Sequence, residues 1–348
     1  MYQRGWPPPQ PSPRGGGSGI GRWLALLALA ALTACSRGPD APGTTSPKNA
    51  TAPATASVCG QTVAYPQTPQ RAVAHGINIV EMVLALGLQD RLAGYGGVRD
   101  IARLPPAMQA QLAGVPDLSS QGMNLETLLG AQADFVFSGW SYGFRAGQVT
   151  PEALAEYGIA SYVLTESCIR QGPRERVSLQ DTFADLLALG RIFRVESRAQ
   201  ALVDGQSAQL QALRRQLQGL PARPLVFLFD SGTDVPVTAG RFAMPHAMIE
   251  AAGGRNLFED IASSWTRGNW EDVIARDPDW IVIVDNDRPA PDGKRQFLLA
   301  QPQLAHLKAV RERRFVLLDF AEATPGPRNV AATLRIARAL HPERVPAP

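Results

Sequence analysis

Short apolar runs alternate along this chain with stretches whose hydrophobic residues recur at helical spacing. Residues 226–229 (VFLF) and 281–284 (IVIV) have no polar alternation, which is typical of strands covered on both faces, as in parallel sheets. The pattern therefore predicts an α/β fold. We expect strands at residues 71–75, 91–95, 133–140, 161–165, 225–230, 235–239, 280–285 and 315–320. We expect helices at residues 80–88, 125–131, 152–158, 244–252, 270–275 and 329–340, with a mostly helical stretch at 178–217.

One short sequence motif occurs twice, 145 positions apart. Each copy has a cap-forming Asn, a Glu in the first helical turn, and an Asp eight residues after that Glu, directly before an apolar strand. These residues are Asn124, Glu126 and Asp134 in the first copy and Asn269, Glu271 and Asp279 in the second. The repeat favours two lobes of similar architecture with a ligand between them, although any α/β protein contains several helix-then-strand units.

A long helix is predicted between the two halves. Its second part begins at Ser197, where Ser197-Arg-Ala-Gln200 fits a capping box, and it stops at Gly219 and Pro221. A helix of 20 residues is about 30 Å long, enough to connect two lobes by itself. We therefore predict a first lobe at residues 59–195, a linking helix at 196–220 and a second lobe at 221–348; an ordinary packing helix within one lobe is the alternative.

The N-terminus predicts an export signal. Residues 1–34 contain Arg22 and the apolar run 23–31, which is shorter than the roughly 20 residues of a membrane span. Residues 32–35 (LTAC) have the form of a bacterial lipobox, which predicts lipidation of Cys35 and a tether to the outer face of the cytoplasmic membrane. The alternatives are an ordinary cleaved secretory peptide and a core helix in the cytoplasm. Residues 35–58, rich in Pro, Thr, Ala and Gly, predict a flexible stalk.

The remaining cysteines predict a disulfide. With Cys35 assigned to lipid, Cys59 and Cys168 are left as a pair in an oxidising compartment. Their bond would close a loop of about a hundred residues and add about 4–5 kcal/mol on the chain-entropy model; two buried free thiols are the alternative.

Charge and metal-ligand patterns exclude several function classes. From Cys35 onward the chain has 31 basic and 31 acidic residues. This balanced charge does not favour binding of the mature part to nucleic acid. There is no CxxC or Cys/His cluster, which disfavours zinc, and we expect neither a resident cofactor nor a metal site.

Several segments together match one family pattern. They are 69–71 (PQR) with 81–87 (EMVLALG), 121–126 (QGMNLE), 253–258 (GGRNLF), Trp265 and 270–276 (WEDVIAR). They resemble the binding proteins for ferric siderophores, haem and vitamin B12 that serve ABC importers. The resemblance runs from about Cys59 to Leu340 and implies two Rossmann-like lobes with parallel sheets joined by one long helix, the class III periplasmic-binding-protein fold.

The resemblance also implies partners. In that family one glutamate on each lobe docks onto arginines of the membrane permease, and the matching positions are Glu126 and Glu271. A carboxylate at a helix start gains about 0.3–1 kcal/mol from the helix dipole without burial, so a purely local role is the alternative. We expect a monomer that binds a small molecule, a permease and, through its lipid, the membrane, and that catalyses nothing.

Aromatic and arginine residues are the candidates for the ligand cleft, which we expect at the carboxyl ends of the strands. Aromatic faces offer contact area, and Arg pairs with carboxylates and oxygen-rich chelates. The candidates are Trp140, Tyr142, Arg145, Arg241, Phe242, Trp265, Arg267 and His75. Trp265 matches a cleft position of the family. Each aromatic could instead pack on its own lobe, and His75 could be a satisfied loop residue.

The sequence leaves several ligand classes open. An anionic ferric siderophore suits the aromatic and Arg lining best, with a corrinoid, haem or another anionic cofactor as alternatives. Several relatives that bind vitamin B12 have an aromatic where this chain has Ser120, and the usual Thr before the first-helix Glu is Val80 here. Both departures weaken a cobalamin assignment more than a siderophore one.

An enzyme is the alternative from another class. Residues 139–143 (GWSYG) spell G-x-S-x-G after an apolar strand, with His246, His306 and His341 downstream, as in an α/β serine hydrolase using Ser141. The motif requires a helix directly after the serine, and Gly143, Gly147 and Pro151 disfavour one. Residues 94–97 (GYGG) lack the third spaced glycine of a dinucleotide fingerprint.

Overall fold

The computed structural model describes residues 52–119, 123–286 and 291–346. By its contacts the chain divides into residues 1–50 and one compact unit, residues 51–348, to which all the elements below belong. Cys35 and the predicted signal peptide lie outside the described residues, as does Ser120.

The first lobe is built on a five-stranded parallel sheet in the order β5-β4-β3-β6-β7. Its strands are β3 (Ala72–His75), β4 (Leu92–Gly96), β5 (Asp117–Ser119), β6 (Phe135–Ser138) and β7 (Ala160–Val163). Its helices are α1 (Ile77–Ala85), α2 (Pro106–Gln111), α3 (Leu125–Gly130), α4 (Pro151–Ala155) and α5 (Leu179–Phe193), with 3₁₀ turns η1 (Gln89–Arg91), η2 (Ile101–Arg103) and η3 (Thr165–Arg170). The central strands β3 and β6 are buried along their whole length: each has three apolar residues followed by one buried polar residue, His75 in β3 and Ser138 in β6.

The second lobe contains a four-stranded parallel sheet in the order β10-β8-β12-β13. Its strands are β8 (Leu225–Phe229), β10 (Arg255–Asn256), β12 (Trp280–Asp285) and β13 (Phe315–Asp319), and β9 (Val237–Ala239) pairs separately with β11 (Trp265–Arg267). Its helices are α7 (Met244–Ala251), α8 (Trp270–Arg276), α9 (Pro291–Ala300), α10 (Lys308–Arg311), α11 (Phe320–Ala323) and α12 (Asn329–Leu340), with the 3₁₀ turn η4 (Pro302–Leu304). The predicted fold class is confirmed.

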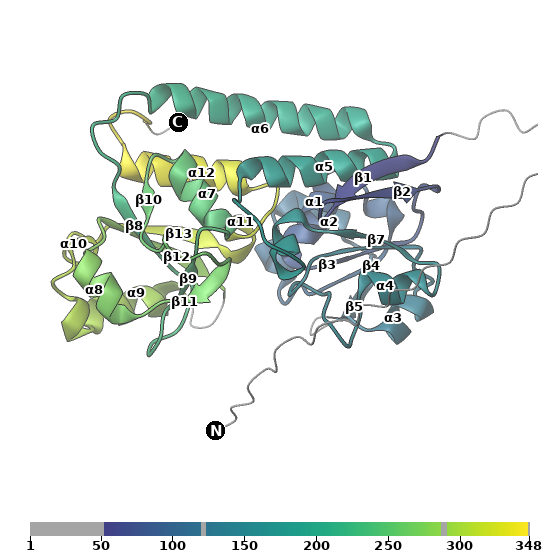
Figure 1. Ribbon diagram of the computed structural model, residues 1–348, viewed down its shortest axis with the longest axis horizontal. Coiled ribbons are helices and arrows are strands. Elements are labelled where there is room, and N and C mark those ends of the chain that lie inside the picture. The colour runs from purple at the N-terminus through teal and green to yellow at the C-terminus, as the bar shows by residue number, and fades with distance from the viewer. Residues whose placement is uncertain (1–51, 120–122, 287–290, 347–348) are drawn as a thin grey trace, which may run out of the picture. The chain divides into compact units, whose positions relative to one another are not determined.

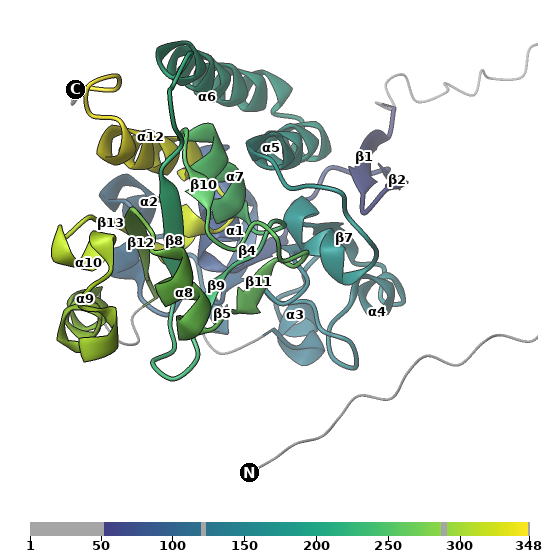
Figure 2. The same ribbon diagram turned by 60° about the vertical axis from the view of Figure 1, so that its left-hand side comes forward.

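Helix α6 (Glu196–Gln216) links the lobes. It starts beside α5, runs above both sheets and ends ahead of β8 (Figure 1; Figure 2 shows the same helix after a 60° turn). The predicted capping box at Ser197 is wrong, because the helix begins one residue earlier and its cap residue, Val195, makes no side-chain cap bond. The preceding Arg194 is left-handed (φ 59°) and ends α5, so the chain turns sharply between two packed helices.

The 145-residue repeat has a structural basis in both lobes. Asn124 Oδ1 caps α3 by accepting from Thr127 N at 2.8 Å, and Asn269 Oδ1 caps α8 in the same way. Asp134, just before β6, accepts from Arg71 N at 2.9 Å, at the start of the neighbouring strand β3. Asp279, just before β12, accepts from Leu225 N at 2.8 Å at the start of β8. Each Asp therefore ties the beginning of one central strand to its neighbour.

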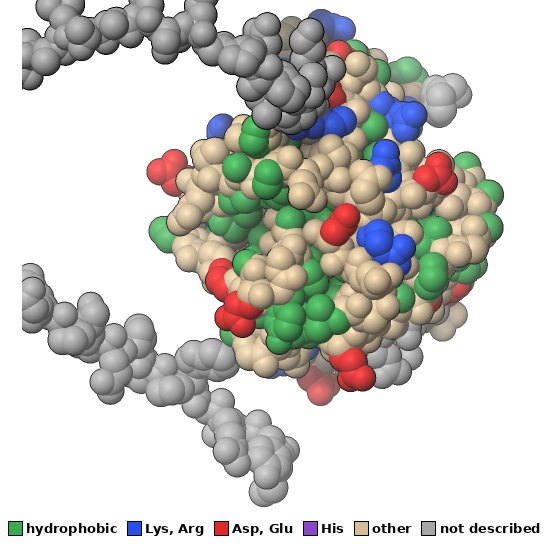
Figure 3. Space-filling model, turned by 90° about the vertical axis from the view of Figure 1, so that its right-hand side faces the viewer, with side chains coloured by type: hydrophobic (Ala, Val, Ile, Leu, Met, Phe, Trp, Pro, Cys, Tyr) green, Lys and Arg blue, Asp and Glu red, His purple; other side chains and the backbone are tan. Residues whose placement is uncertain are grey.

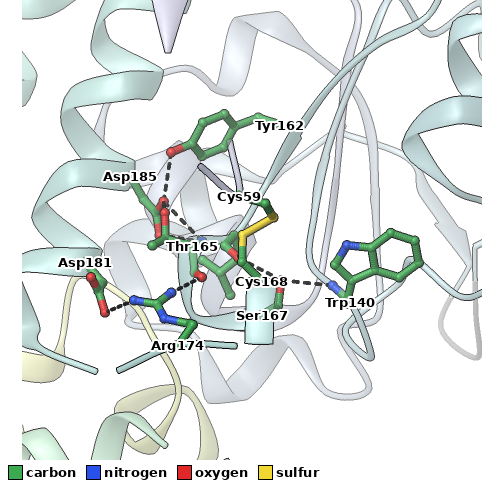
Figure 4. The surroundings of a disulfide bond; sticks show 10 residues. Cys59, Trp140, Tyr162, Thr165, Ser167, Cys168, Arg174, Asp181 and Asp185 are labelled. Atoms are coloured by element: carbon green, nitrogen blue, oxygen red, sulfur yellow. Dashed lines mark hydrogen bonds and ion pairs between the residues drawn. A yellow bond between two sulfur atoms is a disulfide. The ribbon is translucent and has the colours of Figure 1, made fainter. Parts of the chain in front are cut away.

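The hairpin of β1 (Ala54–Val58) and β2 (Gln61–Tyr65) covers α5 and corrects the predicted stalk. Residues 54–58, which we expected to be flexible, form a strand whose Ala54 and Ala56 side chains are buried. The predicted disulfide is present: Cys59, at the hairpin turn, is bonded to Cys168 on η3, with Cα atoms 5.2 Å apart (Figure 4). The bond fixes the hairpin to the first lobe.

Buried hydrogen bonds connect helices of the first lobe to residues 325–329 of the second lobe. Asn78 Nδ2, on α1, donates to Pro325 O at 2.7 Å, and Thr182 Oγ1, on α5, donates to Asn329 Oδ1 at 3.2 Å. On the outer face of the first lobe, by contrast, acidic and basic side chains are interspersed, as the balanced charge of the mature chain suggests (Figure 3).

Asp185 should make stability depend on pH. Its buried carboxyl accepts from Tyr162 OH at 2.8 Å and from Thr165 Oγ1 at 2.5 Å, and burial raises its pKa from 3.8 to about 7 (Figure 4). Between these pKa values the folded state holds a proton that the unfolded state has lost, so the free energy of unfolding falls as pH rises from about 4 to 7. Asp185→Asn removes this proton uptake. It should therefore reduce the pH slope of the free energy of unfolding by up to about 1.4 kcal/mol per pH unit, in urea unfolding measured from pH 4.5 to 8.

The control for this experiment is Asp204→Asn, which changes an exposed carboxylate on α6 and should keep the wild-type slope. An unchanged slope in Asp185→Asn would show that Asp185 does not take up a proton on folding.

Candidate functional site

A cavity of about 740 Å³ lies at the carboxyl ends of the first-lobe strands. Its wall includes His75 from the end of β3, Arg99 from the loop after β4, and Tyr142 and Arg145 from the loop after β6. The strands of a parallel sheet all end at this edge, so loops far apart in sequence converge on it.

A second cavity of about 370 Å³ lies between the lobes. Asn78 and Arg103 line it from the first lobe, and Ser231, Asn286 and Phe320 line it from the second. The two cavities share Gly97, Arg99, Ser141 and Tyr142 as wall residues. They are therefore adjoining compartments of one cleft.

Two guanidinium groups give the larger compartment its charge. Arg99 and Arg145 are both exposed, and within the described part of the chain neither side chain has an ion pair or hydrogen bond. Arg103, in contrast, forms an ion pair with Asp285 at 2.7 Å across the lobes. The compartment thus offers two cations to a ligand while its neighbour contains a cation already engaged by a carboxylate.

His75 lines the same compartment as these arginines. Its side chain is 5% exposed, and Nδ1 donates to the Tyr142 carbonyl at 2.8 Å. Burial lowers the pKa of His75, so the imidazole is neutral at pH 7 and Nε2, which has no partner among the described residues, is an acceptor. A Cβ on Gly97 or Gly143 would lie 2.8 Å from the imidazole ring, so glycine at both positions makes room for it.

Of the sequence-predicted ligand residues, His75, Tyr142 and Arg145 line the cleft. Trp140 does not: its ring packs on Phe144 with centroids 6.1 Å apart, and its backbone N–H donates to Ser167 Oγ. Trp140 therefore packs on its own lobe, which was the alternative left open by the sequence.

The four predicted residues of the second lobe line neither cavity. The Arg241 guanidinium lies over the Phe242 ring, 5.5 Å from its centroid, and Phe242 is buried. Arg267 is exposed on β11. Trp265 is half-buried against the second-lobe core and within hydrogen-bonding reach of Tyr142. Their contact with a ligand stays a prediction.

Sequence reasoning missed Arg99, Arg103, Asn78, Asn286 and Phe320. A signal existed for Arg99, because it follows the glycine-rich turn 94–97 at the end of a strand, a segment considered above only as a nucleotide motif. The others meet across the lobes and had no local signal.

Ser141 lacks the setting of a serine nucleophile. It is exposed, left-handed (φ 69°) and followed by a turn through Gly143 instead of the helix that the G-x-S-x-G motif requires. Its side chain lies on the wall shared by both compartments.

Glu126 and Glu271 lie at equivalent, exposed positions in the first turns of α3 and α8. Figure 1 shows both helices at the side of the molecule opposite α6, one on each lobe. Among the described residues, no helix combines the length and the apolar character of a membrane span.

Comparison with known proteins places these features in context. The sequence profile of the periplasmic binding protein family matches residues 73–322. The vitamin B12-binding protein of Pectobacterium carotovorum subsp. carotovorum (strain PC1) is 25% identical over 222 residues, 64% of this chain and 73% of that protein.

Solved structures agree with the fold. A periplasmic binding protein from Veillonella parvula superposes with a TM-score of 0.72 at 29% identity, over 83% of this chain and 97% of that one. An ABC-type Fe³⁺-hydroxamate transport protein from Saccharomonospora viridis superposes with a TM-score of 0.71 at 24% identity, over 82% of this chain and 98% of the other. A periplasmic haem-binding protein from Pseudomonas aeruginosa gives a TM-score of 0.64 at 24% identity, covering 80% and 95%.

Proposed function

This chain belongs to the periplasmic binding protein family, and from that premise we propose that it captures an anionic iron chelate of the siderophore class in its inter-lobe cleft. It delivers the chelate to the permease of an ABC importer. The relatives are substrate-binding proteins and not enzymes, so binding and handover are its whole activity.

One observation carries the choice of an anionic ligand: Arg99 and Arg145, two guanidinium groups that have no partner among the described residues, line a cavity of about 740 Å³. Guanidinium groups form short, charge-assisted hydrogen bonds with carboxylate and catecholate oxygens. The neutral His75, which lines the same cavity, adds an acceptor but no third charge. This lining favours a ligand that presents at least two anionic oxygens.

A corrinoid is the second candidate, and the vitamin B12-binding relatives favour it. A corrinoid needs more volume than a small chelate, and the adjoining compartment of about 370 Å³ would supply it. Haem, whose two carboxylates also suit a pair of arginines, is the third.

Titration of tryptophan fluorescence distinguishes the three. The probes are ferric tris(catecholate), ferric citrate, cyanocobalamin and haemin. The proposal expects saturable quenching with one of the ferric chelates at micromolar concentration or below and at least tenfold weaker binding of the other classes. Tight binding of cyanocobalamin or haemin alone would replace the siderophore assignment.

The two arginines should carry a large share of affinity for an anionic chelate. Arg99→Ala and Arg145→Ala should each weaken binding of the tightest ferric probe about tenfold to a hundredfold, because a hydrogen bond to a charged group contributes about 1.5–3 kcal/mol. Arg176→Ala, which removes an exposed guanidinium from a groove beside α6, is the matched control and should bind like wild type. Equal affinity in all three variants would exclude Arg99 and Arg145 as ligand contacts.

We also propose that Cys35 is lipidated and holds the protein at the outer face of the cytoplasmic membrane. The support is the LTAC sequence together with membership of an extracytoplasmic family. Metabolic labelling with a fatty acid should mark the wild-type protein and not Cys35→Ser; equal labelling of both would disprove the anchor.

A further inference from the structure

Glu166 is a buried carboxylate that touches both lobes and lines neither cavity. It lies on η3 of the first lobe and is 2% exposed. Its Oε2 accepts from Tyr142 OH at 2.9 Å. Its Oε1 accepts from Met244 N at 3.1 Å and from Ser264 Oγ at 3.3 Å, both in the second lobe. One side chain thus joins the wall of the cleft to the opposite lobe.

We propose that Glu166 is a positioning residue for the cleft: it fixes the Tyr142 side chain and the amino end of α7 in one arrangement, and so sets ligand affinity without contacting ligand. Tyr142 is the link to the ligand, because it belongs to the wall of both compartments. This inference rests on the proposed binding role of the cleft.

The amino end of α7 suits a carboxylate. Met244 is the first residue of this helix, and its N–H is one of those that no helical carbonyl can satisfy. The next residue, Pro245, has no N–H, so Met244 supplies a donor that the adjoining position lacks. A carboxylate here satisfies that donor and interacts favourably with the helix dipole.

The backbone around Glu166 is held on both sides. Thr165 N and Oγ1 donate to Asp185 at 3.2 and 2.5 Å, Ser167 Oγ donates to Leu164 O at 2.7 Å, and Cys168 is in the disulfide (Figure 4). The segment therefore cannot shift to replace a lost contact. Shortening the Glu166 side chain should free Tyr142 and α7 instead.

The first test is a double-mutant cycle on affinity. Glu166→Ala should weaken binding of the tightest probe among ferric tris(catecholate), ferric citrate, cyanocobalamin and haemin by about tenfold, and Glu166→Gln, which keeps an acceptor, by less. Once Tyr142 is replaced by Phe, Glu166→Gln should cost less affinity than it does in the wild type, because the contact between the two side chains is already lost. Glu152→Ala, an exposed carboxylate on α4, is the control.

The second test needs no ligand. Hydrogen–deuterium exchange of the peptide spanning residues 242–248 should be faster in Glu166→Ala than in wild type and close to wild type in Glu166→Gln. Unchanged exchange in Glu166→Ala overturns the inference whether or not any probe binds. If the wild type binds a probe and Glu166→Ala binds it equally well, the inference is also overturned. Full additivity of Glu166→Gln with Tyr142→Phe overturns it too. Failure of the wild type to bind any of the four probes counts against the proposed function instead.

Discussion

Arg328→Ala is expected to lower the free energy of unfolding at pH 7 by about 3–5 kcal/mol, because it leaves a fully buried carboxylate without its partner. Glu81, on α1 of the first lobe, is 0% exposed, and its two oxygens lie 2.8 and 3.0 Å from Arg328 Nη2 and Nε. Arg328 precedes α12 of the second lobe and also pairs with Asp319 at 2.9 Å. The pair therefore ties the lobes as well as stabilising each one.

The cost should depend on pH in a defined direction. Burial raises the pKa of Glu81 to about 7, and Arg328 opposes that shift. Without Arg328, burial and the nearby carboxylates of Glu322 and Asp319 all raise the pKa of Glu81, so its carboxyl should remain protonated to higher pH in the folded variant. The loss of unfolding free energy caused by Arg328→Ala should consequently be smallest near pH 5, where Glu81 can take up a proton, and largest above pH 7.

Two further variants make the measurement specific. Arg335→Ala removes a half-exposed guanidinium from α12, the helix that follows Arg328, and should lower the free energy of unfolding by less than about 1 kcal/mol. Replacing both partners, as Glu81→Met with Arg328→Met, should recover most of the loss, since the variant no longer contains a buried Glu81 carboxylate without its partner. A loss in Arg328→Ala that matches Arg335→Ala in urea unfolding would contradict the buried pair.

The sequence predicted the buried framework well because buried parallel strands leave an unmistakable apolar pattern. Residues 225–230 and 280–285 were expected as strands and form β8 and β12 within one residue. Strand ends were less certain where a side chain competes for the backbone. Thr165 was expected in a strand, but its N–H donates to Asp185 and it begins η3 instead.

Elements made of small residues were missed. Ala54 and Ala56 alternate with Thr55 and Ser57, so β1 has the inside-outside pattern of a strand, but the buried side chains are too small to distinguish it from a flexible stalk. Only its pairing with β2 and its packing on α5 reveal the strand. The composition therefore placed the start of the folded body at residue 59, five residues after the start of β1 at Ala54.

The site was partly predictable for a similar reason. Residues at the ends of strands, such as His75 and Tyr142, could be placed at the cleft because parallel topology fixes where strands end. Arg103 and Asp285 could not be paired from sequence, because 182 positions separate them and their contact depends on how the lobes dock. Glu166 had no signal at all, since its partners come from three different segments.

Reversing the charge at both proposed docking residues, Glu126→Arg with Glu271→Arg, should abolish uptake while leaving ligand affinity within about twofold of wild type. Both carboxylates are exposed, and neither lines the cleft. If they meet arginines of the permease, reversal places like charges in contact, which costs several kcal/mol and about a hundredfold or more in productive docking.

Folding should survive these substitutions. Each arginine would stand at the positive end of a short helix, a loss of about 0.3–1 kcal/mol per site. The Asn124 and Asn269 caps remain in place. A loss of uptake could therefore be attributed to docking, provided that unfolding of the variant stays cooperative.

The matched control reverses two other exposed helix-start acids, Glu152→Arg on α4 and Asp292→Arg on α9. It changes the net charge by the same amount and loses the same kind of helix-dipole interaction. Uptake of a radiolabelled ferric probe into cells that express the permease should be near wild type for the control and absent for Glu126→Arg with Glu271→Arg. Equal loss of uptake in both pairs would point to net charge. Retained uptake in the Glu126 and Glu271 pair would show that these glutamates do not dock onto the permease and are ordinary helix-start residues.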